Sequence, residues 1–142
     1  MRLLTDNFVK KSIRVESHMK LITFTTAGFS RIGALVDGDK VVDLNYAYQS
    51  QLQSEGKYRY EEIAEAYVPA KMEGFLQGGK ESLEIAKAAV DFALEHPASF
   101  KHQLVYDKSD VKVEAPVTQP GKIFCVGHNY REHILEMGRE LP

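Results

Sequence analysis

The chain has 142 residues, of which 44% are hydrophobic and 27% charged, the composition of an ordinary globular protein. A formal net charge of −2 gives no electrostatic reason to expect nucleic acid or an anionic membrane as a partner, and no apolar run approaches the ~20 residues that cross a bilayer. The single cysteine, Cys125, excludes an internal disulfide and is typical of a reducing compartment, so we expect a cytoplasmic protein.

The first eighteen residues differ in character from the rest of the chain. They carry scattered basic residues and show neither helical nor strand periodicity. They lack the continuous apolar core of a secretory signal, and their acidic residues argue against an organellar targeting peptide. We therefore expect residues 1–18 to be a disordered extension and the folded part to begin at Met19.

Strand-forming residues dominate the next stretch. Residues 21–26, 31–36 and 40–44 are rich in β-branched and aromatic side chains. Ala27-Gly28 offers a first turn, and Asp37-Gly38 is a strong signal for a two-residue hairpin. The pattern predicts a three-stranded antiparallel meander.

Four helical segments are expected after the meander. Asn45 is suited to cap the first helix, which should end near Gly56. The others are expected at residues 60–67, 71–76 and 81–95. The last is the clearest, because apolar residues recur in it at steps of three or four: Leu83, Ala86, Val90 and Leu94.

The remaining sequence is mostly extended. Residues 104–106 and 111–113 have the pattern of short strands, and the proline-rich stretch 115–121 that of a connecting segment. Residues 122–127 form an apolar run suited to a buried strand, and residues 131–137 predict a final short helix.

These elements predict an α+β fold in four parts. After the extension we expect a small α+β domain at residues 19–100 and a linker with short strands at 101–121. Residues 122–142 would begin a second unit. One strand and one helix leave both sheet edges unpaired, so this second unit should be incomplete.

The candidate catalytic residues are His133 and Glu136. They are three positions apart, so on a helix they share one face. An imidazole beside a carboxylate can accept a proton as a general base. The pair also comes after an apolar strand that ends in glycine, a place where active groups are common. The alternative is an exposed polar pair on an amphipathic helix whose inward face carries Ile134, Leu135 and Met137.

Neighbouring residues are weaker candidates. Asn129 and Tyr130 could hydrogen-bond a polar substrate, the alternatives being a helix cap and a packing tyrosine. His128 fits a surface loop, and Cys125, inside an apolar run, fits a buried unreactive thiol. The sequence contains no phosphate-binding glycine motif and no HExxH or Asp-x-Asp metal motif.

Several of these stretches resemble the fumarylacetoacetate hydrolase family. Residues 20–24, 31–35, 41–44 and 72–79 are similar to the small N-terminal domain of its bacterial members. Residues 115–127, with the motif Gly127-x-Asn129-Tyr130-x-x-His133-x-x-Glu136, resemble the entry into its catalytic domain.

The resemblance implies a metal-dependent enzyme. The family's catalytic domain is a mixed β-roll that binds Mg²⁺ or Mn²⁺ through three acidic side chains. Its members hydrolyse, decarboxylate or isomerise small 2-oxo acids and acylpyruvates, commonly as homodimers. By that match the last helix is a lid, His133 the general base, Glu136 its orienting partner, and Asn129 and Tyr130 line the substrate site.

The metal-binding carboxylates of the family lie further along than this sequence extends. Stabilisation of developing charge is usually the largest contribution to the rate, whereas a dyad supplies about 10²–10⁴-fold. We therefore expect the isolated chain to bind no metal and to be inactive, and its unpaired apolar side chains to favour self-association. The alternative is a non-enzymatic association or regulatory module.

Overall fold

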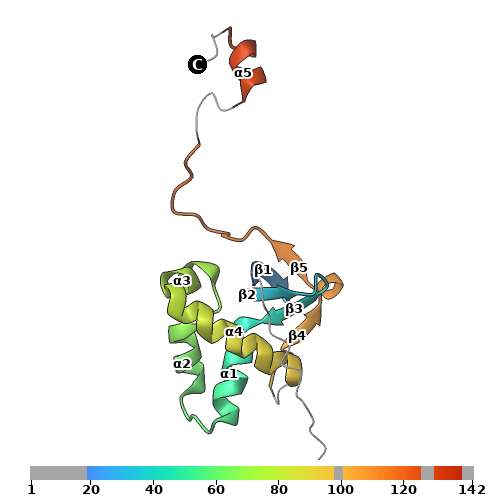
Figure 1. Ribbon diagram of the computed structural model, residues 1–142, viewed down its shortest axis with the longest axis vertical. Coiled ribbons are helices and arrows are strands. Elements are labelled where there is room, and N and C mark those ends of the chain that lie inside the picture. Colours follow the sequence, from blue (N-terminus) through green and yellow to red (C-terminus); the bar gives the residue numbers. More distant parts are fainter. Residues whose placement is uncertain (1–18, 98–100, 126–129, 139–142) are drawn as a thin grey trace, which may run out of the picture.

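The computed structural model describes residues 19–97, 101–125 and 130–138. The described part is α+β, as expected: a five-stranded antiparallel sheet with four helices, followed by a fifth, short helix that stands apart from them (Figure 1). The expected extension at residues 1–18 lies outside the described residues. Among the described helices, none combines the length and the apolar character needed to cross a bilayer.

The predicted three-stranded meander is confirmed. Its strands are β1 (Lys20–Thr26), β2 (Phe29–Val36) and β3 (Lys40–Asp43). Ala27 and Gly28 form the first turn, with φ of 47° and 83°. The second loop has three residues rather than the two expected, because Val36 pairs with Lys40.

Two further strands extend the meander at both edges. β4 (Val105–Asp107) pairs with β3, and β5 (Lys112–Glu114) pairs with β1. The order is β4-β3-β2-β1-β5. Both short strands were expected, but in a linker; instead they complete the sheet, so the folded unit continues to the end of β5.

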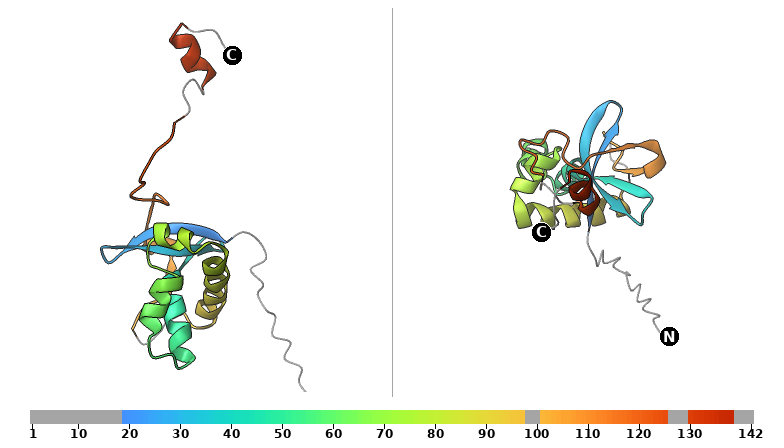
Figure 2. Two further views of the ribbon diagram at one scale, coloured as in Figure 1. Left: turned by 90° about the vertical axis from the view of Figure 1, so that its left-hand side faces the viewer. Right: turned by 90° about the horizontal axis from the view of Figure 1, so that it is seen from above.

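The sheet is strongly curled. Four strand spacings would separate the edges of a flat sheet by about 19 Å. Yet only the 3-10 turn η1 (Lys108–Asp110) and Val111 connect β4 to β5, and a 3-10 turn rises only about 2 Å per residue. The edges must therefore curve toward each other, as the hairpins splaying around the sheet indicate (Figure 2).

The curled face encloses a small apolar cluster. Phe24, Val41 and Val111 form its buried centre. The Phe24 ring lies over Gly33 in the middle of β2, where an added Cβ would be 2.9 Å from the ring atom Cε1. A glycine inside a strand often marks such a close approach.

The other face of the sheet packs against the helices. They are α1 (Leu44–Ser54), α2 (Tyr60–Tyr67), α3 (Met72–Gln77) and α4 (Gly79–Glu95). All four were predicted, α2 with its observed bounds and the others with small differences in their bounds. The cap of α1 is Asp43 rather than Asn45, since the Asp43 carboxylate accepts the Tyr46 N–H at 2.9 Å. The buried stripe of α4 is richer in small residues than expected: Ser82, Ala86, Ala89, Val90 and Ala93.

Beyond β5 the chain leaves the folded unit. Residues 115–125 are exposed and contain neither helix nor strand. The strand expected at 122–127 is therefore wrong over 122–125, and 126–127 lie outside the described residues. A strand requires a hydrogen-bonding neighbour, and none lies beside this segment within the described part. The last helix, α5 (Arg131–Glu136), is confirmed.

Candidate functional site

The predicted acid–base residues both lie on α5. His133 and Glu136 are three positions apart in this helix, which is the spacing that places two side chains on one face. Leu135 and Met137 are 57% and 45% exposed, and Glu136 is exposed as well. The roles of His133 and Glu136 on this helix therefore stay predictions.

The other predicted site residues are only partly described. Tyr130 immediately precedes α5 and is 75% exposed. Asn129 and His128 lie outside the described residues. Cys125 is exposed, so the expectation of a buried thiol was wrong, because the strand that would have enclosed it is absent.

The described residues do not fit a divalent metal site. Nowhere in that part of the chain do three histidine, cysteine, aspartate or glutamate side chains come together as ligands. Mg²⁺ and Mn²⁺ favour several oxygen ligands, mainly carboxylates and water. Among the described residues, α5 therefore has no companion set of the metal ligands that the family resemblance implies.

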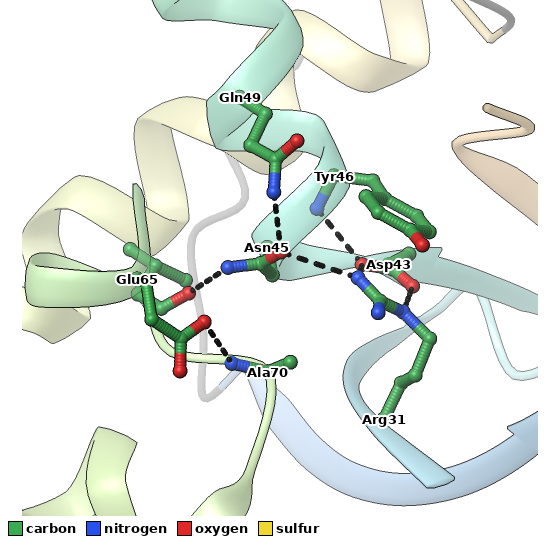
Figure 3. A network of polar contacts seen from close by, with 8 residues as sticks. Arg31, Asp43, Asn45, Tyr46, Gln49, Glu65 and Ala70 are labelled. Atoms are coloured by element: carbon green, nitrogen blue, oxygen red, sulfur yellow. Dashed lines mark hydrogen bonds and ion pairs between the residues drawn. The ribbon is translucent and has the colours of Figure 1, made fainter. Parts of the chain in front are cut away.

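A buried charged cluster is the feature that sequence reasoning missed. The Asp43 side chain is fully buried and that of Arg31 is 11% exposed. Arg31 donates through Nε and Nη2 to the two carboxylate oxygens of Asp43, and Nη2 also donates to Asn45 Oδ1 at 3.2 Å (Figure 3). This two-pronged arrangement joins β2 to the start of α1.

Asn45 extends the cluster to a second helix. Its Nδ2 donates to the Val68 carbonyl oxygen at 2.7 Å, and its Oδ1 accepts from Gln49 at 2.8 Å. Val68 is the C-cap residue of α2, so the cluster fixes α2 against α1 and the sheet.

An aromatic stack covers the charged pair. The Arg31 guanidinium carbon is 3.4 Å from the centroid of the Tyr46 ring, and the His102 ring stacks on Tyr46 at 3.7 Å with an interplanar angle of 4°. Burial and the Arg31 charge lower the pKa of His102. Burial alone would lower the pKa of Arg31, but its hydrogen bond and charge attraction to Asp43 raise it.

The cluster is organised for stability rather than for chemistry. Burial raises the pKa of Asp43, while the hydrogen bonds from Arg31 and from the Tyr46 N–H act in the opposite direction. Each charged group is satisfied by the other, so neither is presented to a substrate. The signal that could have revealed it is an aspartate directly before a helical pattern, the usual place of a cap.

Comparison with known proteins gives relatives of one kind. No family model matches the chain. It is 32% identical over 127 residues to the mitochondrial oxaloacetate tautomerase fahd2 of Xenopus laevis, covering 87% of this chain and 32% of that protein. It is 28% identical over 110 residues to the oxaloacetate tautomerase YisK of Bacillus subtilis (strain 168), covering 77% of this chain and 33% of that protein.

A third relative carries the family name. The fumarylacetoacetate hydrolase domain-containing protein 2 of Pongo abelii is 35% identical over 75 residues, covering 53% of this chain and 21% of that protein. The chain thus spans about a third of the length of the first two relatives. The shared sequence and the motif on α5 agree: the chain belongs to the fumarylacetoacetate hydrolase family.

Proposed function

We propose that this chain provides the amino-terminal portion and the acid–base helix of an enzyme that interconverts the keto and enol forms of a small 2-oxo acid. Oxaloacetate is the first candidate substrate. The observation that carries the proposal is the similarity to oxaloacetate tautomerases over 87% and 77% of the chain.

The chemistry needs one proton to move from carbon to oxygen. A base removes a proton from the carbon next to the keto group, and the resulting enolate oxygen takes up a proton to give the enol. His133 is the base in this scheme, and Glu136, three positions along α5, orients its imidazole. Asn129 and Tyr130 hydrogen-bond the substrate, and no electrons are exchanged.

Hydrolysis and decarboxylation of related oxo acids are the other reactions of the family. A divalent cation would polarise the keto acid in any of them. Because the described residues do not assemble its ligands, no step is assigned to the cation. In this proposal the metal ligands come from further sequence that corresponds to the two thirds of each relative that this chain does not match.

A chimeric enzyme tests the proposal. Residues 19–142 would replace the matched stretch of the Bacillus subtilis relative, and oxaloacetate tautomerisation would be followed by the ultraviolet absorbance of the enol in the presence of Mg²⁺ or Mn²⁺. We expect a folded, active chimera whose kcat falls about 10²–10⁴-fold in the His133→Asn variant. An active chimera indifferent to this change would refute the role of His133.

The second candidate is a non-enzymatic association module. It is favoured by the folded unit, whose two apolar clusters lie within residues 19–111 and do not include α5. The coding sequence after Pro142 discriminates between the two: three acidic ligands there favour the enzyme. The 142-residue chain alone should not accelerate oxaloacetate tautomerisation, and calorimetry should detect no tight Mn²⁺ binding to it.

A further inference from the structure

The segment that leads from the folded unit toward α5 is held at one point. We call residues 115–125 the exit arm; every one of them is exposed. Strand pairing ends just before it, at the pair Thr23–Glu114. Because the rest of the arm is exposed, contacts made by its first residues decide the direction in which it leaves the folded unit.

A buried hydroxyl fixes them. Thr23 on β1 is 4% exposed, and its Oγ1 donates to the carbonyl oxygen of Pro116 at 2.6 Å. Proline has no N–H, so its carbonyl is the backbone group by which it can be held. Within the described part of the chain, this is the one hydrogen bond recorded between the exit arm and the folded unit.

The contact also brings the arm alongside α3. A groove of about 310 Å³ opens between the β1–β2 end of the sheet, the start of α3 and the arm. Thr118 and Gln119 form its arm side, opposite Lys71 and Glu73. The arm thus runs along the surface of the folded unit for some residues beyond Pro116 before leaving it.

We propose that Thr23 is a positioning residue: its hydroxyl latches the first residues of the exit arm to β1 and so sets the direction in which the arm leaves the folded unit, on the side of the chain that leads to His133 and Glu136. The catalytic meaning of this latch rests on the function proposed above. The latch itself can be tested without any activity.

A spin label makes the arm observable. Cys125, in the arm, is the only cysteine of the chain and is exposed, so a nitroxide can be attached at that single site. Paramagnetic broadening of backbone amides then reports where Cys125 lies relative to β1 and α3. Mixing spin-labelled chains with isotope-labelled chains that carry no nitroxide identifies broadening between molecules, which is subtracted.

Three variants isolate the hydroxyl. Thr23→Val removes it at almost constant shape, Thr23→Ser keeps it, and Thr25→Val removes a neighbouring hydroxyl that contacts Glu114 instead. A hydrogen bond of ordinary strength predicts that Thr23→Val lowers the ratio of latched to free arms about 2- to 12-fold. The broadening should spread over more of the folded unit, while Thr23→Ser and Thr25→Val retain the wild-type profile.

The outcomes are decisive in either direction. A Thr23→Val protein with native spectra and an unchanged broadening profile overturns the latch. If valine disturbs the sheet, the pair Thr23→Ala and Thr23→Ser is compared, and equal profiles for these two also overturn it. In the chimera, loss of the latch should lower kcat with little change in the unfolding midpoint. A working latch in a chimera indifferent to His133→Asn would refute the catalytic proposal alone.

Discussion

Gly33 shows how one missing side chain permits the curl of the sheet. An added Cβ would lie 2.9 Å from Phe24 Cε1 and 3.0 Å from the Val42 carbonyl oxygen, and a backbone atom of a paired strand cannot move aside easily. Gly33→Ala should therefore lower the free energy of unfolding by about 1–3 kcal/mol, measured by urea denaturation. Gly121→Ala is the matched control, since nothing lies within 4 Å of its added Cβ; an equal loss in both variants would contradict the packing argument.

The ion pairs of Arg31 with Asp43 and of Lys40 with Asp107 allow a buried pair to be compared with an exposed one. Arg31→Met leaves the carboxylate of Asp43 charged and fully buried, so we expect a loss of about 3–5 kcal/mol. Lys40 pairs with Asp107 where the two side chains are 45% and 55% exposed, and Lys40→Met should cost less than about 1 kcal/mol. Chemical denaturation of both variants checks this, and similar losses would show that burial does not decide the strength of the Arg31 pair.

His102 should make the folded state sensitive to acid. Burial, followed by the charge of Arg31 and then Lys101, lowers its pKa below the ordinary value of 6.5, although Asp43 and Glu61 oppose the shift. Between the lowered pKa and about 6.5 the unfolded chain binds more protons than the native one, so stability rises with pH in that window. The unfolding midpoint should therefore fall between about pH 7.5 and 5.5 more steeply in the wild type than in His102→Gln; parallel curves would exclude this contribution.

Among the secondary-structure elements, α4 is closely packed along its row of small residues. Ala89 is fully buried in the same core cluster as Leu44 and Ala47 of α1, and Ala88, its neighbour in sequence, is exposed. Ala89→Leu adds volume that this contact has no room for and should cost about 1–3 kcal/mol. Ala88→Leu should stay within about 0.5 kcal/mol in the same thermal unfolding experiment, and a comparable loss at both positions would point to helix propensity instead.

The type of each element was more predictable from sequence than its partner. Local turn chemistry and periodicity identified the meander and all of the described helices. The placing of β4 and β5 at opposite edges depends on pairing with β3 and β1, which no local pattern records. The same holds for residues 122–125, whose apolar character predicts a strand but cannot provide its neighbour.

The candidate site was predictable only as a motif. The spacing of His133 and Glu136 and their helix could be read from the chain, because both are local properties. The pairing of Arg31 with Asp43 could not, since it arises from the sheet register that brings β2 beside β3. The latch between Thr23 and Pro116 joins residues 93 positions apart and was missed for the same reason.

At the scale of the whole molecule, apolar exposure is concentrated beyond the folded unit. Ile123 and Phe124 in the exit arm are 76% and 89% exposed, next to a helix with exposed Leu135. Fully burying a side chain of this size is favourable by about 1.5–3 kcal/mol. A chain with several such residues close together gains by covering them, and a second copy is always present to do so.

We therefore expect concentration-dependent self-association, measured by sedimentation velocity over a wide range of protein concentration. Ile123→Ser with Phe124→Ser should raise the dissociation constant by about tenfold or more, since each change removes a favourable burial. Tyr58→Ser is the control: Tyr58 is 99% exposed, but it lies in the loop between α1 and α2, away from the arm. If the wild type stays monomeric throughout, or the Tyr58 variant weakens association equally, the arm is not the surface on which copies meet. If only the Ile123→Ser, Phe124→Ser double substitution weakens association, the arm is the surface on which copies meet. A longer member of this family would then have to cover this segment with its own catalytic part.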